Sequence, residues 1–332
     1  MKIALTYDDI QLIPEYSEIQ SRKDISLDTK LTINFSINMP IIAAPMPTVC
    51  GLDMAIELME FGATGCIHRF MSIEQQADVV GCLLMNRMHS PIVAAVGATG
   101  DYLERAVELI NSGVDVILID VAHGHHKNVK EAINKIKPLF KGDIIAGNIA
   151  TAQAAIDLQD WGADALRVGI GGGSLCTTRL KTGFGVPNVS CLIDIIKVAK
   201  VPVIADGGIR TSGDIAKALA LGASSVMIGS MIAGTTESPG SLIRKPNGLY
   251  KKYEGAASFE TKINNGQAVR NIEGESTIIP YKGNVKEVLS DVIDGVKSAL
   301  SYAGANNLKE FKPKFVQVTN AGHIEGKPHL IS

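Results

Sequence analysis

The chain has 332 residues, a formal net charge of −2 and 46% hydrophobic residues. This composition is typical of a globular protein, gives no basic footprint for nucleic acid, and contains no apolar run of the roughly 18 residues that span a membrane. Five cysteines without a Cys-x-x-Cys pair, and a first segment too acidic for a signal peptide, predict free thiols and a cytoplasmic location.

Short apolar runs rich in Val and Ile alternate with helix signals along the chain. The runs lack a clean polar alternation, which is typical of strands covered on both faces. Eight such runs separated by helices predict one (β/α)8 barrel domain over residues 1–332, with an open doubly wound sheet as the alternative. The expected strands lie at 39–46, 63–70, 90–97, 114–124, 142–151, 163–173, 201–208 and 224–230.

Capping residues mark where the helices between these strands begin. Ser72 and Gln75 form a capping-box pattern after the second strand, and later helices open on Asp or Thr and end on Gly. The expected helices run over 72–86, 101–113, 151–162, 214–222 and 285–304, and the first four begin at Ser72, Asp101, Thr151 and Asp214.

The segment 241–283, after the eighth strand, breaks this rhythm. It is polar and contains five glycines. Long insertions in compact domains are usually functional lids or disordered excursions. We therefore expect a mobile flap here.

Polar residues and glycines follow several of the expected strands, at the end where barrel active sites lie. Glycines after the seventh and eighth strands expose backbone N–H groups that bind phosphate, which makes Gly208, Gly229 and Ser230 candidates. Asp206 is placed to accept hydrogen bonds from ribose hydroxyls. The alternative is that these glycines only form tight turns.

The stretch "GIGGGSLCTTR" (169–179) places Cys176 in a glycine-rich loop after the sixth strand. A partly exposed thiol near helix N-termini has a lowered pKa and acts as a nucleophile. The alternative is an incidental loop cysteine. Repeated glycines can also turn the carbonyl oxygens of 171–176 inward around a monovalent cation.

Several segments, in the same order along the chain, resemble the IMP dehydrogenase/GMP reductase family. They are "LTYDDIQLIPEYSEI", "DVAHGH", "AGNIAT", "GIGGGSLCTTR", "VIADGGIRTSGDIAKALALGA" and "VMIGSMIAGTTESPG". The resemblance covers nearly the whole chain. It implies a purine nucleotide bound on a (β/α)8 barrel, a nicotinamide cofactor and a homotetramer.

The resemblance also implies roles for individual residues. Cys176 would be the nucleophile on purine C2. The nucleotide would be bound by Met46, Ser174, Asp206, Gly208, Gly229, Ser230, Tyr253 and Gly255. Asp120, Asn148 and Arg179 would face the cofactor, and the carbonyls of Gly171, Gly173 and Cys176 would face potassium.

Three features favour a GMP reductase within the family. The regulatory CBS pair that dehydrogenases usually insert after the second helix is absent, "RLKTGFG" (179–185) resembles the reductase loop, and the flap has no Arg-Tyr dipeptide. The resemblance then implies NADPH-dependent deamination of GMP to IMP and ammonia through a thioimidate on Cys176. Thr178 with Glu260 would protonate the amine, with Glu254 as the substitute acid.

Other functions remain open from the sequence. The first alternative is an IMP dehydrogenase without a CBS domain, which oxidises IMP to XMP with NAD, because "MSIEQQA" and "HIEGKPHLI" resemble dehydrogenases. A silent purine-nucleotide-binding protein and a flavin-dependent barrel oxidoreductase are the other two classes.

Overall fold

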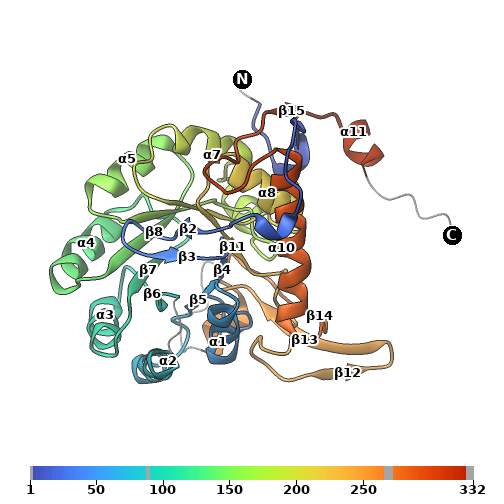
Figure 1. Ribbon diagram of the computed structural model, residues 1–332. Helices are drawn as coiled ribbons and strands as arrows, with labels where there is room; N and C mark the ends of the chain where they lie inside the picture. The colour runs from blue at the N-terminus through green and yellow to red at the C-terminus, as the bar shows by residue number, and fades with distance from the viewer. Residues whose placement is uncertain (1–2, 87–89, 265–271, 327–332) are drawn as a thin grey trace.

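The computed structural model describes residues 3–86, 90–264 and 272–326, and its centre is a closed barrel of eight parallel strands (Figure 1). Each strand pairs with the next along the chain, and the last pairs back with the first. This confirms the predicted (β/α)8 barrel, and each strand falls inside a predicted run. The strands are β4 (Ile41–Ala43), β5 (Thr64–Ile67), β6 (Val93–Val96), β7 (Val116–Asp120), β8 (Asp143–Ile149), β9 (Ala165–Val168), β10 (Val203–Asp206) and β11 (Ser225–Ile228).

Helices surround the barrel and bury their apolar faces against it. A second apolar cluster fills the barrel interior, with Ile42, Leu118 and Ile204 among its members. Both faces of each strand are therefore covered, which explains the continuous apolar runs. The helices are α1 (Leu52–Glu60), α2 (Ile73–Met85), α3 (Tyr102–Asn111), α4 (Lys127–Ile136), α5 (Ala152–Asp160), α6 (Thr178–Thr182), α7 (Asn188–Ile196), α8 (Ser212–Ala220) and α10 (Val285–Tyr302).

The predicted helix caps are largely confirmed. Ser72 and Gln75 form the capping box of α2, and the Thr151 side chain caps α5. The predicted start of α8 at Asp214 is wrong by two residues. Thr211 is its N-cap, and the Asp214 carboxylate accepts the Thr211 N–H from inside the first turn. Asp214 thus completes a capping box instead of opening the helix.

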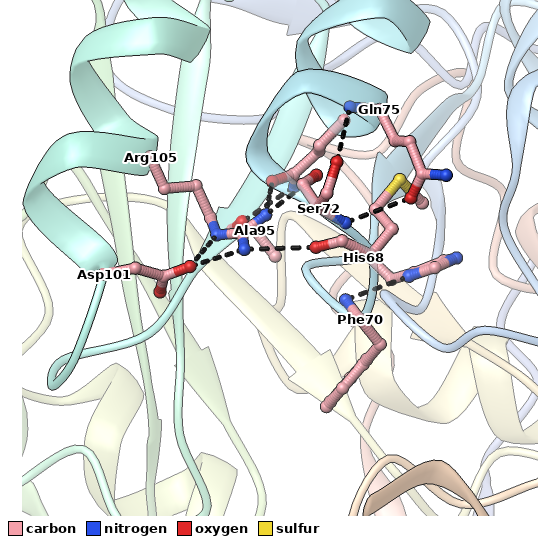
Figure 2. A network of polar contacts seen from close by, with 9 residues as sticks. His68, Phe70, Ser72, Gln75, Ala95, Asp101 and Arg105 are labelled. Carbon is pink, nitrogen blue, oxygen red and sulfur yellow. Dashed lines mark hydrogen bonds and ion pairs between the residues drawn. The ribbon is translucent and has the colours of Figure 1, made fainter. Parts of the chain in front are cut away.

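A buried polar network joins α2 to α3 beside the carboxyl ends of β5 and β6 (Figure 2). The Arg105 guanidinium donates to Asp101 Oδ2 at 2.6 Å and to Gln76 Oε1 at 2.9 Å. Gln76 Nε2 in turn donates to the Ala95 carbonyl at 2.9 Å. Because buried polar groups need partners, this network fixes how the two helices sit on the barrel.

Short strands outside the barrel hold the chain ends and close the barrel floor. The hairpin β2 (Thr29–Lys30) with β3 (Ser36–Ile37) adds Leu31 and Ile37 to the interior cluster. Strand β1 (Ile10–Leu12) pairs with β15 (Phe315–Gln317), and helix α11 (Asn320–Glu325) follows. The 3-10 turns are η1 (Tyr7–Asp9), η2 (Arg22–Asp24) and η3 (Lys137–Leu139).

The flap forms an ordered three-stranded antiparallel sheet that projects from the barrel beside α10 (Figure 1). Its elements are β12 (Ile243–Lys245), β13 (Gly248–Glu254), α9 (Phe259–Asn264) and β14 (Ser276–Pro280). Residues 265–271 of the predicted flap lie outside the described residues. None of the helices in the described part of the chain has the length and apolar character needed to cross a membrane.

Candidate active site

A cavity of about 520 Å³ opens at the carboxyl ends of the barrel strands. This is the end where the sequence places the chemistry, and the fold brings nearly all of the predicted residues to its wall. The predicted residues that line it are Met46, Asp120, Asn148, Gly171, Gly173, Ser174, Cys176, Thr178, Asp206, Gly208, Gly229, Ser230, Tyr253 and Gly255.

The cysteine loop is paired with the returning arm of the flap. The Thr177 N–H donates to the Glu273 carbonyl, and the Glu275 N–H donates to the Leu175 carbonyl, both at 2.9 Å. Cys176 and Gly274 face each other in this antiparallel bridge. The flap therefore fixes the backbone on both sides of the thiol.

A chain of hydrogen bonds runs from the thiol to a flap carboxylate. Cys176 Sγ donates to Thr178 Oγ1 at 3.2 Å, and Thr178 Oγ1 donates to Glu273 Oε2 at 2.7 Å. Glu273 also lines the cavity. The arrangement can carry a proton from the thiol to the carboxylate and return it to a leaving group.

Neither glutamate proposed from the sequence pairs with Thr178, so the expected Thr178–Glu260 pair is wrong. Glu260 lies on α9, where a hydrogen bond from Ser276 and the neighbouring Lys252 lower the pKa of its carboxyl. Glu254 is buried on β13, with its carboxylate 3.8 Å from the Lys252 ammonium. The chain folds back after α9, and this return places Glu273 at the cysteine loop.

Three hydroxyl groups meet at the loops after β9 and β11. Ser174 Oγ lies 3.0 Å from Tyr253 OH, and Ser230 also hydrogen-bonds to this tyrosine. Burial raises the pKa of Tyr253, while its bond with Ser174 acts in the opposite direction. Tyr253 is therefore a neutral hydroxyl at neutral pH and can donate a hydrogen bond.

The turn after β10 supplies backbone to the same region. Gly207 and Gly208 have φ angles of +85° and +73°, which L side chains rarely adopt. A Cβ on Gly207 would lie 2.9 Å from the carbonyl carbon of Gly172. The glycines thus allow the turn to approach the cysteine loop closely.

A buried guanidinium lies between two carboxylates at the carboxyl ends of β7 and β10. Arg167 Nη1 donates to Asp120 Oδ1 at 2.5 Å, and its Nε donates to Asp206 Oδ2 at 3.0 Å. Asn148 Nδ2 donates to the same Asp206 oxygen at 2.6 Å. Burial alone lowers the pKa of Arg167, but the two aspartates raise it above its ordinary value, so the residue stays charged.

Two features of the mouth differ from the sequence expectation. Arg179 is not part of the cavity wall, because its side chain packs over Gly171 and Gly185. Arg69 does line the cavity, and its Nε is buried with no hydrogen-bond partner in the described residues.

Comparison with known proteins assigns the family over nearly the full length. A sequence model of the IMP dehydrogenase / GMP reductase domain matches residues 4–329. The chain belongs to the IMP dehydrogenase/GMP reductase family.

Relatives within the IMP dehydrogenase/GMP reductase family bear both names. The chain is 39% identical to a GMP reductase of Lactobacillus delbrueckii subsp. bulgaricus, with 93% of each chain covered. It is 32% identical to an inosine-5'-monophosphate dehydrogenase of Nitrosopumilus maritimus, with 99% of this chain and 98% of that protein covered. A solved GMP reductase of Trypanosoma brucei in complex with guanosine 5'-monophosphate is similar with a TM-score of 0.94 and 28% identity, covering 100% of this chain and 99% of that chain.

Besides Arg69, sequence reasoning did not assign Glu273 or Arg167 to the cavity of this family member. Glu273 stands 95 residues from Thr178 along the chain, and its contact depends on how the flap returns. The sequence signal for it is the pair Glu273-Gly274 in "NIEGES", which stands just before the run 276–280 that forms a strand. Arg167 is a charged residue inside the apolar run 163–173, and a charge in a buried strand is itself a signal of function.

Proposed function

We propose that this chain is a GMP reductase that converts GMP to IMP and ammonia with NADPH. The observation that carries the proposal is the hydrogen-bond chain from Cys176 through Thr178 to Glu273. It pairs a nucleophile with a carboxylate that can hold and return one proton, which a displacement of ammonia requires.

The side chains at the site can supply and accept the proton that deamination of GMP requires. The thiol proton of Cys176 passes through Thr178 Oγ1 to the Glu273 carboxylate, and the thiolate attacks C2 of GMP. The C2–N bond then breaks, and the same proton returns to the departing amine, which leaves as ammonia. A thioimidate on Cys176 remains.

The reduction step needs a nicotinamide cofactor. The part of the cavity that Arg69 lines fits such a group. Arg69 Nε, which forms no hydrogen bond in the described residues and lies 3.8 Å from Asp120 Oδ2, lines this side with the Asp120 carboxylate, so a group with both phosphates and hydroxyls has partners there. When bound, NADPH supplies the hydride that reduces C2. Cys176 then departs as the thiolate, which releases IMP and is reprotonated from solvent.

The nucleotide is proposed to bind by its phosphate and ribose ends. Ser174, Ser230 and Tyr253 supply hydroxyls, and Gly208 and Gly229 supply backbone N–H groups to the phosphate. Asp206 accepts from the ribose. Met46 packs near the base and Gly255 lines the cavity beside it.

We extend the proposal to a monovalent cation, a homotetramer and a cytoplasmic location. The Gly173 carbonyl accepts the Cys176 N–H at 3.1 Å, and a carbonyl has a second lone pair for a cation. The carbonyls of Gly171 and Cys176 accept no hydrogen bond in the described chain, which fits potassium coordination. All five cysteines are free, which suits a reducing compartment.

The reductase direction is favoured over the dehydrogenase by the flap sequence. A dehydrogenase must activate water to hydrolyse its adduct, and the family uses an Arg-Tyr pair on the flap for this. No such dipeptide occurs between 241 and 283. The alternative is an IMP dehydrogenase, the name borne by the Nitrosopumilus maritimus relative.

Replacing the nucleophile tests the mechanism. We expect Cys176→Ala to abolish turnover of GMP while GMP still binds, because the phosphate and ribose contacts are intact. Calorimetry for binding and NADPH absorbance for turnover measure this. Cys82→Ala, a half-buried cysteine on α2, is the matched control and should keep full activity. Residual turnover in Cys176→Ala near the wild-type level would rule the mechanism out.

A further inference from the structure

The contacts of Arg167 join the two halves of the cavity. Its guanidinium reaches Asp206, on the proposed nucleotide side, and Asp120, on the proposed cofactor side, from strand β9 between them. The Arg167 side chain is 10% exposed, so its charge has few other partners. One cation therefore orders two carboxylates that stand on different strands.

Each carboxylate engages Arg167 with one oxygen and keeps the other for a ligand. Asp206 Oδ2 accepts from Arg167 and Asn148, and no hydrogen bond to Oδ1 is found among the described residues. Asp120 Oδ1 accepts from Arg167, and its Oδ2 lies 3.8 Å from Arg69 Nε. Both aspartates line the cavity, so the remaining oxygens are available to hydroxyl groups.

The site is built for an arginine at this position. A planar guanidinium donates in two directions at once, whereas a lysine ammonium is a single point charge on a flexible stem. The neighbouring strand approaches closely at this point, because a Cβ on Gly147 would come within 2.6 Å of the Arg167 Cβ. The donor geometry of the guanidinium is therefore what suits arginine to bridge the two carboxylates.

We propose that Arg167 is a positioning residue that couples nucleotide binding to cofactor binding by holding Asp206 and Asp120 with one guanidinium. The inference rests on the proposed function only in that the cavity takes a purine nucleotide and a nicotinamide dinucleotide. It does not depend on the direction of the reaction.

The first test compares the affinities of Arg167→Lys for both ligands. IMP and NADP+ are titrated separately by calorimetry, so that no turnover occurs. We expect the Kd of each ligand to rise about tenfold, since a lysine ammonium cannot donate in two fixed directions and so leaves neither carboxylate held as the guanidinium holds it. A rise for one ligand alone, or for neither, would overturn the coupling.

The second test is a double-mutant cycle with Asp120→Asn, read through the nucleotide. If the guanidinium transmits the change, Asp120→Asn raises the Kd of IMP about threefold in the wild-type background and has no effect in the Arg167→Lys background. The same threefold effect in both backgrounds would mean that Asp120 acts without Arg167, and the proposal fails. No effect in either background also contradicts it.

A stability control separates positioning from folding. Asp143→Ala removes a buried carboxylate at the barrel floor, which Thr32 and Asn34 contact at 2.6 Å and 3.0 Å, far from the cavity wall. It should lower the melting temperature yet leave both Kd values within about twofold. If Asp143→Ala also raised both Kd values, the rise in Arg167→Lys would be explained by lower stability of the fold.

The proposed function can fail separately from the coupling. A wild-type protein that binds IMP but does not oxidise NADPH in the presence of GMP would overturn the proposed function, and the Kd values that test the coupling could still be measured.

Discussion

At the scale of single residues, the proposed chemistry depends on one proton shared by Cys176, Thr178 and Glu273. The thiol donates into this chain and the carboxylate ends it, so the order of the hydrogen bonds sets the route of the proton. In the proposed mechanism the hydroxyls of Ser174, Ser230 and Tyr253 and the Arg167 bridge position the ligands and take no part in this proton transfer. Substitutions along the proton route should therefore affect chemistry more than binding.

Glu273→Gln should slow deamination about 10²-fold to 10³-fold, since an amide cannot carry the proton. When deamination limits the rate, hydride transfer no longer does, so a deuterium isotope effect from labelled NADPH should disappear from kcat. Glu260→Gln is the matched control and should change kcat less than twofold, because Glu260 bonds with Ser276 and not with Thr178. A larger isotope effect in Glu273→Gln would show that hydride transfer was slowed instead.

His68 should make the stability of the fold depend on pH. Burial, and then the Arg105 charge, lower its pKa to about 4, and its Nδ1 accepts the Phe70 N–H (Figure 2). The unfolded chain binds this proton more readily, so the contribution to stability is present above about pH 6.5 and is lost as the pH falls toward 4.

Urea unfolding at two pH values measures this contribution. Between pH 7.5 and 5.0 the wild type should lose about 2 kcal/mol of unfolding free energy through His68. His68→Asn keeps an acceptor for the Phe70 N–H but does not titrate, so its loss over the same range should be about 2 kcal/mol smaller. Equal losses in both proteins would contradict the assignment.

The sequence predicted those site residues that lie within one motif or at a strand end. Cys176 and Thr178 follow the same strand, and Asp120, Asn148 and Asp206 lie at the carboxyl ends of β7, β8 and β10, so barrel geometry alone brings them together. Glu273 required knowing how a long insertion folds back, which local pattern does not encode. Glu260 was expected because the resemblance implies a glutamate shortly after the "GAAS" segment of the flap, but this position along the flap does not set nearness to Thr178.

At the scale of elements, the flap is held to the barrel by a buried lysine on β13. Lys251 Nζ donates to the carbonyls of Thr235 and Thr236 at 3.0 Å and 3.1 Å, and to that of Ser238. Burial lowers the pKa of this lysine, although Glu237 acts in the opposite direction. The strand that carries Tyr253 is thus fixed to the loop after β11.

Lys251→Met should loosen this attachment and weaken nucleotide binding. We expect the KM for GMP to rise about tenfold with kcat within about threefold, because the role proposed for Tyr253 is to bind the phosphate and not the reacting atoms. Lys252→Met, an exposed neighbour on the same strand, is the control and should leave KM unchanged. A fall in kcat with KM unchanged in Lys251→Met would instead place the flap in the chemical step.

Element prediction succeeded where caps and apolar periodicity act locally. Ser72 and Thr151 cap their helices as expected, whereas α8 begins at Ser212, after its N-cap Thr211, because Asp214 is the third helical residue and completes the capping box. The flap sheet was missed because the residues that β13 buries are Lys251, Tyr253 and Glu254, none of which is purely apolar. The flap strands therefore lack the apolar–polar alternation that marks a half-buried strand.

At the scale of the whole molecule, the barrel follows from the alternation of strands and helices, but its floor does not. The hairpin of β2 and β3 closes it, and Asp143 holds the hairpin turn through Thr32 and Asn34. These contacts join residues more than a hundred positions apart. Nothing in the local sequence marks them.

Asp143→Ala should lower the unfolding free energy by about 2–4 kcal/mol, because it leaves buried donors of the hairpin without an acceptor. Denaturant unfolding measures the change. Asp194→Ala removes an exposed carboxylate 3.4 Å from Lys197 and should change stability by less than about 0.5 kcal/mol. Equal effects of the two substitutions would contradict the closing role of the floor.

The central claim, that the chain runs the reductase direction, is tested most directly by one spectrophotometric comparison. The purified protein is mixed with GMP and NADPH in one cuvette, and with IMP and NAD in another, and absorbance of the reduced nicotinamide is followed. The account predicts loss of absorbance with GMP and NADPH, with ammonia released in equal amount. A gain of absorbance with IMP and NAD, and no loss with GMP and NADPH, would contradict it and identify a dehydrogenase.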